Sequence, residues 1–206
     1  MINHDFKFVF IHQRKCAGTS IKRCLQSLFP VPERDLHFAN EGTLCPSLSR
    51  YAALGYLIIA SCRNPWDRLV SGWSHLQKPE FQSSPYNGKT FRDTVLNLPR
   101  PDSNCGVHAE GHDYRHLTRC QLDTLMLGSR FVPDVVLRFE SLQQDFDKLL
   151  DRLGVSSAPL PCDNQSSRTH YSNYYDEFLV NLVSTHFSED IEHFGYDFED
   201  SIWKLQ

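Results

Sequence analysis

Residues 12–20 (His-Gln-Arg-Lys-Cys-Ala-Gly-Thr-Ser) combine the groups that bind a phosphate or a sulfate. Arg14 and Lys15 supply positive charge, and Gly18 allows the backbone to approach an anion closely. Thr19 and Ser20 follow at the start of a predicted helix, whose unpaired amides and dipole favour a negative ligand. This segment therefore predicts an anion site. Taken alone, it is also consistent with a surface turn that carries a solvated lysine and a Thr/Ser helix cap.

The order of residues in this loop argues against an ATPase of the ordinary P-loop class. A Walker A loop has the order Gly-x-x-x-x-Gly-Lys-Ser/Thr, so its lysine follows the glycines. Here Lys15 comes before Gly18 and the two hydroxyl residues.

A second candidate phosphate pocket lies in residues 63–71 (Arg-Asn-Pro-Trp-Asp-Arg-Leu-Val-Ser). Arg63 ends a predicted strand, and its planar guanidinium suits a phosphate. Ser71 follows two helical turns later and can add a hydroxyl contact. The alternative is that Asn64 and Pro65 only begin a helix, beside arginines that are solvated.

Short apolar strands alternate with helices along the chain. The strands are predicted at residues 6–11, 56–61 and 135–139, and their nearly continuous apolar character is typical of strands that are buried on both faces. Helices are predicted from residue 19 or 20, from Pro65 towards Gln77, after Ser141 and from near Ser172. This alternation predicts an α/β, three-layer fold with a central parallel sheet flanked by helices. Ligands of such sheets bind at the carboxyl ends of the strands, where both candidate pockets begin.

Helix caps sharpen these boundaries. Asn64 is a good N-cap, Pro65 fits the first helical position, and Asp67 complements the positive end of the helix dipole. Ser141 is the predicted cap of the third helix, which Gly154 ends. The last helix presents one apolar side, made of Phe178, Leu182, Val183, Phe187 and Ile191.

Length and composition predict one domain over residues 1–206, with an irregular, variable segment at about 78–116 that carries one short helix. The net charge of −4 gives no reason to expect nucleic acid as a partner. From Asp134 onward there are 14 acids and 5 bases, whereas the preceding residues hold 11 acids and 16 bases. An anionic ligand is therefore expected to bind in the N-terminal part.

No apolar stretch is long enough for a signal peptide or a membrane span. The seven cysteines show no Cys-x-x-Cys spacing, and their odd number argues against a complete disulfide framework. With the initial methionine, this pattern predicts a complete cytoplasmic protein with reduced thiols. A chain trimmed of an N-terminal anchor would look the same, so the Golgi lumen is the alternative.

Taken together, residues 15–20 and 63–71 resemble the two phosphate-binding motifs of the sulfotransferase superfamily, in particular small bacterial relatives of the Golgi carbohydrate sulfotransferases. The first family motif is Lys-x-Gly-Gly-Thr-Ser, and the second is Arg-Asn-Pro-x-Asp-Arg-x-x-Ser. Ala17 stands in place of the first glycine. Residues 137–142, 174–176 and 190–196 are also similar to family segments, so the resemblance covers most of the chain except residues 78–116.

The resemblance implies 3'-phosphoadenosine 5'-phosphosulfate (PAPS) as the donor, with 3',5'-adenosine bisphosphate as the product and no metal. The acceptor is expected to be a hydroxyl of a carbohydrate or another small metabolite, bound by segment 78–116. Lys15 is the expected catalytic cation. The expected donor-binding residues are Arg14, Lys15, Ala17, Gly18, Thr19, Ser20, Arg63, Ser71 and Arg168. For Arg168, a surface salt bridge is the alternative role.

Two histidines and one glutamate are the candidates for the general base. His37 is the first choice because related enzymes place a histidine near the acceptor at this point between the two motifs; Glu110 and His112 are reserves. A structural or solvated role is the alternative for His37. His108, His112 and His116 have helical spacing that could bind zinc. However, Gly106 and Gly111 interrupt any helix there, so an acceptor-binding or solvated loop is preferred.

Two other functions remain open for this sequence. One is a nucleotide-dependent phosphotransferase on the same broad architecture, and the other is a noncatalytic nucleotide-binding module of the same fold. The missing Walker A order counts against the first, and the intact lysine with both motifs counts against the second.

Overall fold

The computed structural model describes residues 1–30, 32, 35, 45–98, 116–161 and 168–198. The chain divides into two compact units. The first contains Met1–Arg63 and Gln121–Gln165, and the second contains Asn64–Cys120 and Ser166–Gln206. Each unit is described by itself.

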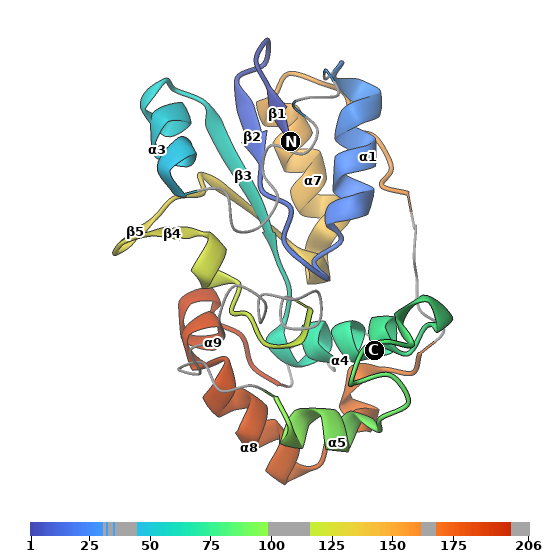
Figure 1. Cartoon of the computed structure of the whole chain (residues 1–206). Coiled ribbons are helices and arrows are strands. Elements are labelled where there is room, and N and C mark those ends of the chain that lie inside the picture. Colours follow the sequence, from blue (N-terminus) through green and yellow to red (C-terminus); the bar gives the residue numbers. More distant parts are fainter. Residues whose placement is uncertain (31, 33–34, 36–44, 99–115, 162–167, 199–206) are drawn as a thin grey trace. The chain divides into compact units, whose positions relative to one another are not determined.

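The first unit is built on a four-stranded sheet in the order β1-β2-β3-β6 (Figure 1). Strands β2 (Phe8–Phe10), β3 (Leu57–Cys62) and β6 (Val135–Arg138) are parallel, with Val9 opposite Ile58 and Ile59 opposite Val135. The three predicted strands are thus confirmed. The sheet is mixed rather than wholly parallel, because β1 (Ile2–Asn3) pairs antiparallel with β2 at its edge. The sequence analysis missed β1, which is only two residues long.

Helices cover this sheet on both sides. Helices α1 (Gly18–Leu28) and α7 (Leu142–Arg152) pack on one face. Their shared core includes Phe8, Phe10, Ile21, Leu25, Leu137, Phe146 and Leu149. Helix α3 (Cys45–Ala53), which was not predicted, contacts β3 on the other side (Figure 1). This architecture confirms the α/β prediction. Residues 12–20 follow the carboxyl end of β2, and Arg63 follows the carboxyl end of β3.

The rest of the first unit consists of short elements. A hairpin joins β4 (Met126–Leu127) to β5 (Arg130–Phe131), and 3-10 turns η2 (Leu122–Thr124) and η3 (Phe139–Ser141) precede β4 and α7. Ser141 occupies the N-cap position of α7, as predicted, but its side chain makes no cap hydrogen bond to a backbone amide. Its hydroxyl donates to the Asp145 carboxylate at 2.9 Å, and the same carboxylate oxygen accepts the Arg138 amide at 3.1 Å. Asp145 therefore joins the end of β6 to the first turn of α7.

The second unit is helical in its described part (Figure 1). It contains α4 (Pro65–Leu76), α5 (Phe91–Leu96), α8 (Glu177–His186) and α9 (Ser188–Phe194), with the 3-10 turns η1 (Pro79–Phe81) and η4 (Tyr171–Tyr174). Helix α5 is the short helix that was predicted within segment 78–116. Across the described ranges, no helix has the length and apolar character needed to cross a membrane.

The predicted last helix is wrong in its start and in part of its buried side. A 3-10 turn begins at Tyr171, α8 begins only at Glu177, and Phe187 separates α8 from α9. Phe178 is 55% exposed, whereas Leu179 is buried beside Val183 and Phe187. Leu182 is exposed as well, so only Phe178 and Leu182 of the predicted side are wrong. Asp176 fixes the start of α8 by accepting the Leu179 amide at 2.8 Å.

Candidate functional site

The loop after β2 adopts a backbone conformation that side chains usually avoid. Lys15 and Ala17 both have left-handed backbones, with φ of 63° and 58°. For residues with a Cβ this region costs roughly 1–2 kcal/mol each, so the surroundings must fix it. Cys16 lies between them, and its buried thiol contacts the Arg14 carbonyl at 3.3 Å and the Gln121 side chain at 3.2 Å. Ala17 therefore stands where glycine would be unstrained, which accounts physically for the glycine of the family motif.

Helix α1 begins directly after this loop without a cap of its own. Its N-cap residue, Ala17, makes no side-chain cap bond, and its first turn holds no acidic residue. The amides that an N-terminal turn leaves unpaired, together with the helix dipole, favour a bound anion. In this turn Gly18 and Ser20 are buried, whereas Thr19 is exposed. This turn can therefore hold an anion through main-chain and hydroxyl groups.

Gly18 is required for space. A Cβ at this position would lie 2.2 Å from Cδ2 of His12 and 2.5 Å from its Nε2. The His12 ring thus packs directly against the first residue of α1. The motif glycine at position 18 is explained by this packing, whereas position 17 favours glycine because of its backbone angle.

The pKa of His12 responds to the burial and the charges of this loop. Burial, followed by the positive charges of Arg14, Lys22 and the N-terminal amine, lowers the pKa of His12 from 6.5 to about 4. The ring is therefore neutral at physiological pH. Burial causes the largest part of this shift and disfavours any ion, whereas the smaller part that comes from the positive charges favours an anion nearby.

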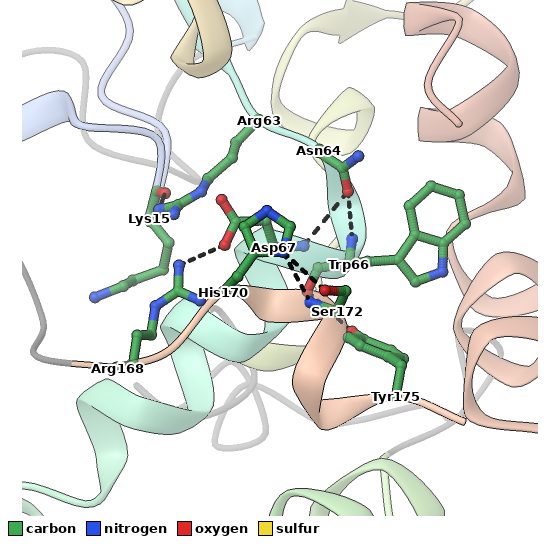
Figure 2. Close-up of polar contacts among 9 residues, drawn as sticks. All are labelled: Lys15, Arg63, Asn64, Trp66, Asp67, Arg168, His170, Ser172 and Tyr175. Carbon is green, nitrogen blue, oxygen red and sulfur yellow. Dashed lines mark hydrogen bonds and ion pairs between the residues drawn. The ribbon is translucent and has the colours of Figure 1, made fainter. Parts of the chain in front are cut away.

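Arg63 meets this loop from the end of β3. Its side chain is 6% exposed, and Nη1 donates to the Lys15 carbonyl at 3.0 Å (Figure 2). The guanidinium also lies over the Phe139 ring, 3.6 Å from the ring centroid. Such stacking fixes the plane of the guanidinium. The structure therefore brings the Arg63 side chain into contact with the Lys15 backbone, in agreement with two candidate pockets at the carboxyl ends of the strands.

The junction from β3 to α4 continues into the second unit with a different arrangement. Asn64 caps α4 by accepting the amides of Trp66 at 3.0 Å and Asp67 at 3.4 Å (Figure 2). This cap, Pro65 at the helix start and Asp67 in the first turn are confirmed. Arg168 forms an ion pair with Asp67, and the two side chains are only 13% and 14% exposed. Arg168 thus makes a salt bridge, as the alternative role predicted, although the pair is mostly buried rather than on the surface.

Tyr175 supports the same turn of α4. Its hydroxyl donates to the Trp66 carbonyl at 2.9 Å (Figure 2). Burial, followed by the negative charge of Asp67, raises the pKa of Tyr175 well above its ordinary value. The hydroxyl therefore remains a donor at all physiological pH values. Within the second unit, this contact and the Arg168 ion pair hold the first turn of α4.

The remaining predicted residues are placed less completely. Ser71 is half-buried on α4, and Arg14 is half-buried in the loop. The candidate bases His37, Glu110 and His112 lie outside the described residues, as does His108. His116 is described: it is buried and stacks on His75, with ring centroids 4.8 Å apart. Its backbone carbonyl packs so closely on Gly72 of α4 that a Cβ there would lie 2.2 Å away.

Sequence reasoning missed three residues that shape the site. These are His12, Phe139 and Gln121, which contact Gly18, Arg63 and the Arg63 backbone, respectively. His12 lies within residues 12–20, so its place in the predicted anion-binding loop was a usable signal that it contributes to the site. Phe139 lies within the family-like residues 137–142, but nothing in the sequence pointed to its contact with Arg63. Gln121 gave no signal, because it is far in sequence from the residues that it contacts.

The mostly parallel sheet, an uncapped helix N-terminus after β2 and an arginine at the end of β3 are typical of an anion-binding α/β protein. Residues 1–197 match the profile of the Sulfotransferase family, so the chain belongs to this family and is a sulfotransferase enzyme. Comparisons with curated proteins and with solved structures found no match.

Proposed function

We propose that this sulfotransferase uses PAPS as its donor and transfers the sulfuryl group to a hydroxyl of a carbohydrate or another small hydroxylated metabolite. The observation that carries the proposal is the contact between the two motifs. An uncapped helix N-terminus with Lys15 beside it meets Arg63, whose guanidinium donates to the Lys15 carbonyl at 3.0 Å. Two motifs held in contact, each with a cationic side chain, suit a nucleotide with anions at both ends.

In the proposed reaction the acceptor oxygen attacks sulfur in line. The new oxygen–sulfur bond forms as the bond from sulfur to the bridging phosphate oxygen breaks, and the leaving electron pair stays on that oxygen. Lys15 stabilises this developing charge, with Arg14 as a helper. Ala17, Gly18, Thr19 and Ser20 contribute main-chain and hydroxyl groups to the 5'-phosphosulfate.

We assign Arg63 and Ser71 to the 3'-phosphate, as the resemblance implies. For Arg63 the stacking on Phe139 supports this role, because it orients the guanidinium before a ligand binds. Arg168 is proposed as a further donor-binding residue. Its ion pair with Asp67 gives it a fixed position at the start of α4.

The acceptor proton goes to a general base, for which we propose His37. Changing His37 to Ala then lowers turnover at saturating donor by about 10²–10⁴-fold and leaves binding of 3',5'-adenosine bisphosphate unchanged. Near-normal turnover removes His37 from the chemistry, and Glu110 and His112 become the next variants.

The direct test of the proposed reaction is a screen of hydroxylated acceptors with radiolabelled PAPS. Carbohydrates and small hydroxylated metabolites form the two arms. Transfer of label to an acceptor supports the proposal. Tight binding of ATP with magnesium, without binding of 3',5'-adenosine bisphosphate, contradicts it and favours a phosphotransferase.

A further inference from the structure

Gln121 is a buried side chain that pairs with the backbone of Arg63. It is 1% exposed and immediately precedes η2. Its Oε1 accepts the Arg63 amide at 2.8 Å, and its Nε2 donates to the Arg63 carbonyl at 3.0 Å. These are the two bonds that the peptide of a neighbouring strand would make. Leu57 and Ile59 of β3 bond towards β2, and by the alternation of a strand Arg63 has its amide and carbonyl on this same side. Gln121 therefore takes the place of a strand partner beyond the end of β2.

The same residue is bonded to the loop after β2. The Cys16 thiol donates to Gln121 Oε1 at 3.2 Å, and the Gln121 backbone carbonyl accepts Gln13 Nε2 at 2.9 Å. Gln13 Nε2 also donates to the Thr124 hydroxyl at 2.6 Å. All four side chains are buried. Gln121 therefore contacts both motifs, although it belongs to neither.

These bonds form a closed ring. Gln121 holds the Arg63 backbone, the Arg63 guanidinium holds the Lys15 carbonyl, and the next residue, Cys16, returns to Gln121. The ring encloses the left-handed Lys15, and Ala17 follows it directly. Strained backbones of this kind persist only where several contacts fix them. Removal of the Gln121 side chain would break the ring at its bonds to Arg63 and to Cys16.

We propose that Gln121 is a positioning residue that sets the distance between the Lys15 loop and Arg63, and thereby matches the site to a ligand with two anionic ends. The inference rests on the proposed function, because it assigns one end of the nucleotide to each motif. Gln121 does not touch the reacting atoms. Its effect is on the spacing of residues that do.

The first test compares two ligands on one variant. In Gln121→Leu, the affinity for 3',5'-adenosine bisphosphate falls at least thirtyfold, since that ligand needs both motifs at the right spacing. The affinity for adenosine 5'-monophosphate, which engages one end only, changes less than threefold. A merely structural role would weaken both ligands alike, and calorimetry that shows equal losses overturns the proposal.

Thr124→Val is the matched control. It removes a buried hydroxyl that bonds to Gln13 and to the Gln121 carbonyl, yet it keeps the Gln121 side chain and its bonds to Arg63 and Cys16. Thermal denaturation of both variants shows the loss of stability that each causes. At similar stability, only Gln121→Leu is expected to change the ratio of the two affinities.

If Gln121→Leu does not fold, Cys16 variants test the bond between Cys16 and Gln121 instead. Cys16→Ala removes the donor to Gln121 and is expected to shift the affinity ratio at least fivefold. Cys16→Ser keeps a hydroxyl donor at the same place and restores most of the ratio. Equal ratios in wild type, Cys16→Ala and Cys16→Ser overturn the proposal.

Hydrogen exchange separates this inference from the proposed function. In Gln121→Leu the amides of Arg63 and of residues 15–18 exchange at least tenfold faster than in wild type, with or without a ligand. Unchanged exchange overturns the positioning role. A wild type that binds neither nucleotide overturns the proposed function instead, whatever the exchange rates show.

Discussion

The two strand-to-helix junctions of this protein satisfy their helix N-termini in opposite ways. At α1 the N-cap is Ala17, no side chain caps the helix, and the first turn holds no acid. At α4 Asn64 accepts two amides, and Asp67 in the first turn pairs with Arg168. An anion fits the first helix end, whereas the second is already neutralised by its own side chains.

This difference indicates how each junction can bind a phosphate. The first offers main-chain amides, a lysine and hydroxyls, all near the start of α1. The second offers side chains, with Arg63 ahead of the cap and Ser71 further along α4. The first junction is thus expected to depend on backbone geometry and the second on single polar side chains. The predictions below test this contrast.

The largest effect is expected from the lysine of the first junction. Lys15→Met removes the charge that is proposed to stabilise the leaving oxygen, and it is expected to lower turnover by about 10²–10³-fold, while the affinity for 3',5'-adenosine bisphosphate changes less than tenfold. Steady-state kinetics at saturating donor measure this loss. The control is Lys148→Met on α7, an exposed lysine paired with Asp145. Equal turnover in the two variants would remove Lys15 from catalysis.

The next effect concerns the pH dependence of stability. Burial and the charges of Arg14 and Lys22 lower the pKa of His12 to about 4, so the unfolded chain takes up this proton first as pH falls. The free energy of unfolding that the neutral His12 ring contributes is fully present above pH 6.5 and is lost as the pH falls towards 4. The difference corresponds to on the order of 3 kcal/mol.

Denaturant unfolding of wild type and His12→Asn at several pH values measures this contribution. The uncharged variant is expected to lose less stability between pH 6.5 and pH 4 than the wild type. Parallel curves for the two proteins would show that His12 does not titrate in this way.

Gly18 should have the next largest effect, because the first junction depends on close packing. Gly18→Ala forces the His12 ring to move and is expected to lower the free energy of unfolding by about 1–3 kcal/mol and to weaken nucleotide binding. His12→Ala in the same chain opens the space, so the double variant should recover part of the loss. Thermal denaturation of the single and double variants gives the coupling; additive losses would contradict the contact.

The smallest effect is a gain. Ala17→Gly relieves a left-handed backbone, and after the greater freedom of the unfolded chain is subtracted, the protein is expected to gain up to about 1 kcal/mol. At the second junction the opposite holds, since Asn64→Ala removes a cap and costs about 1 kcal/mol. Denaturant unfolding measures both changes, and destabilisation by Ala17→Gly would contradict the strain.

Local signals in the sequence predicted the framework of the site. The apolar strands, Asn64, Pro65 and the start of α1 follow from short patterns, and all are confirmed within a residue or two. Contacts between distant residues were not predictable in this way. Gln121 lies 58 positions from Arg63 and 108 from Gln13, and no periodicity links them. The two-residue β1 and the hairpin β4–β5 were missed because they are too short to show a pattern.

The central claim is that Lys15 and Arg63 belong to one site that binds a nucleotide at both of its anionic ends. Calorimetry with 3',5'-adenosine bisphosphate and adenosine 5'-monophosphate, on wild type and Arg63→Ala, tests it most directly. The wild type is expected to bind the bisphosphate about 10–100-fold more tightly, as one charged hydrogen-bonded contact provides, and Arg63→Ala should abolish that preference. No binding by the wild type, or the same preference in Arg63→Ala, would contradict the assignment.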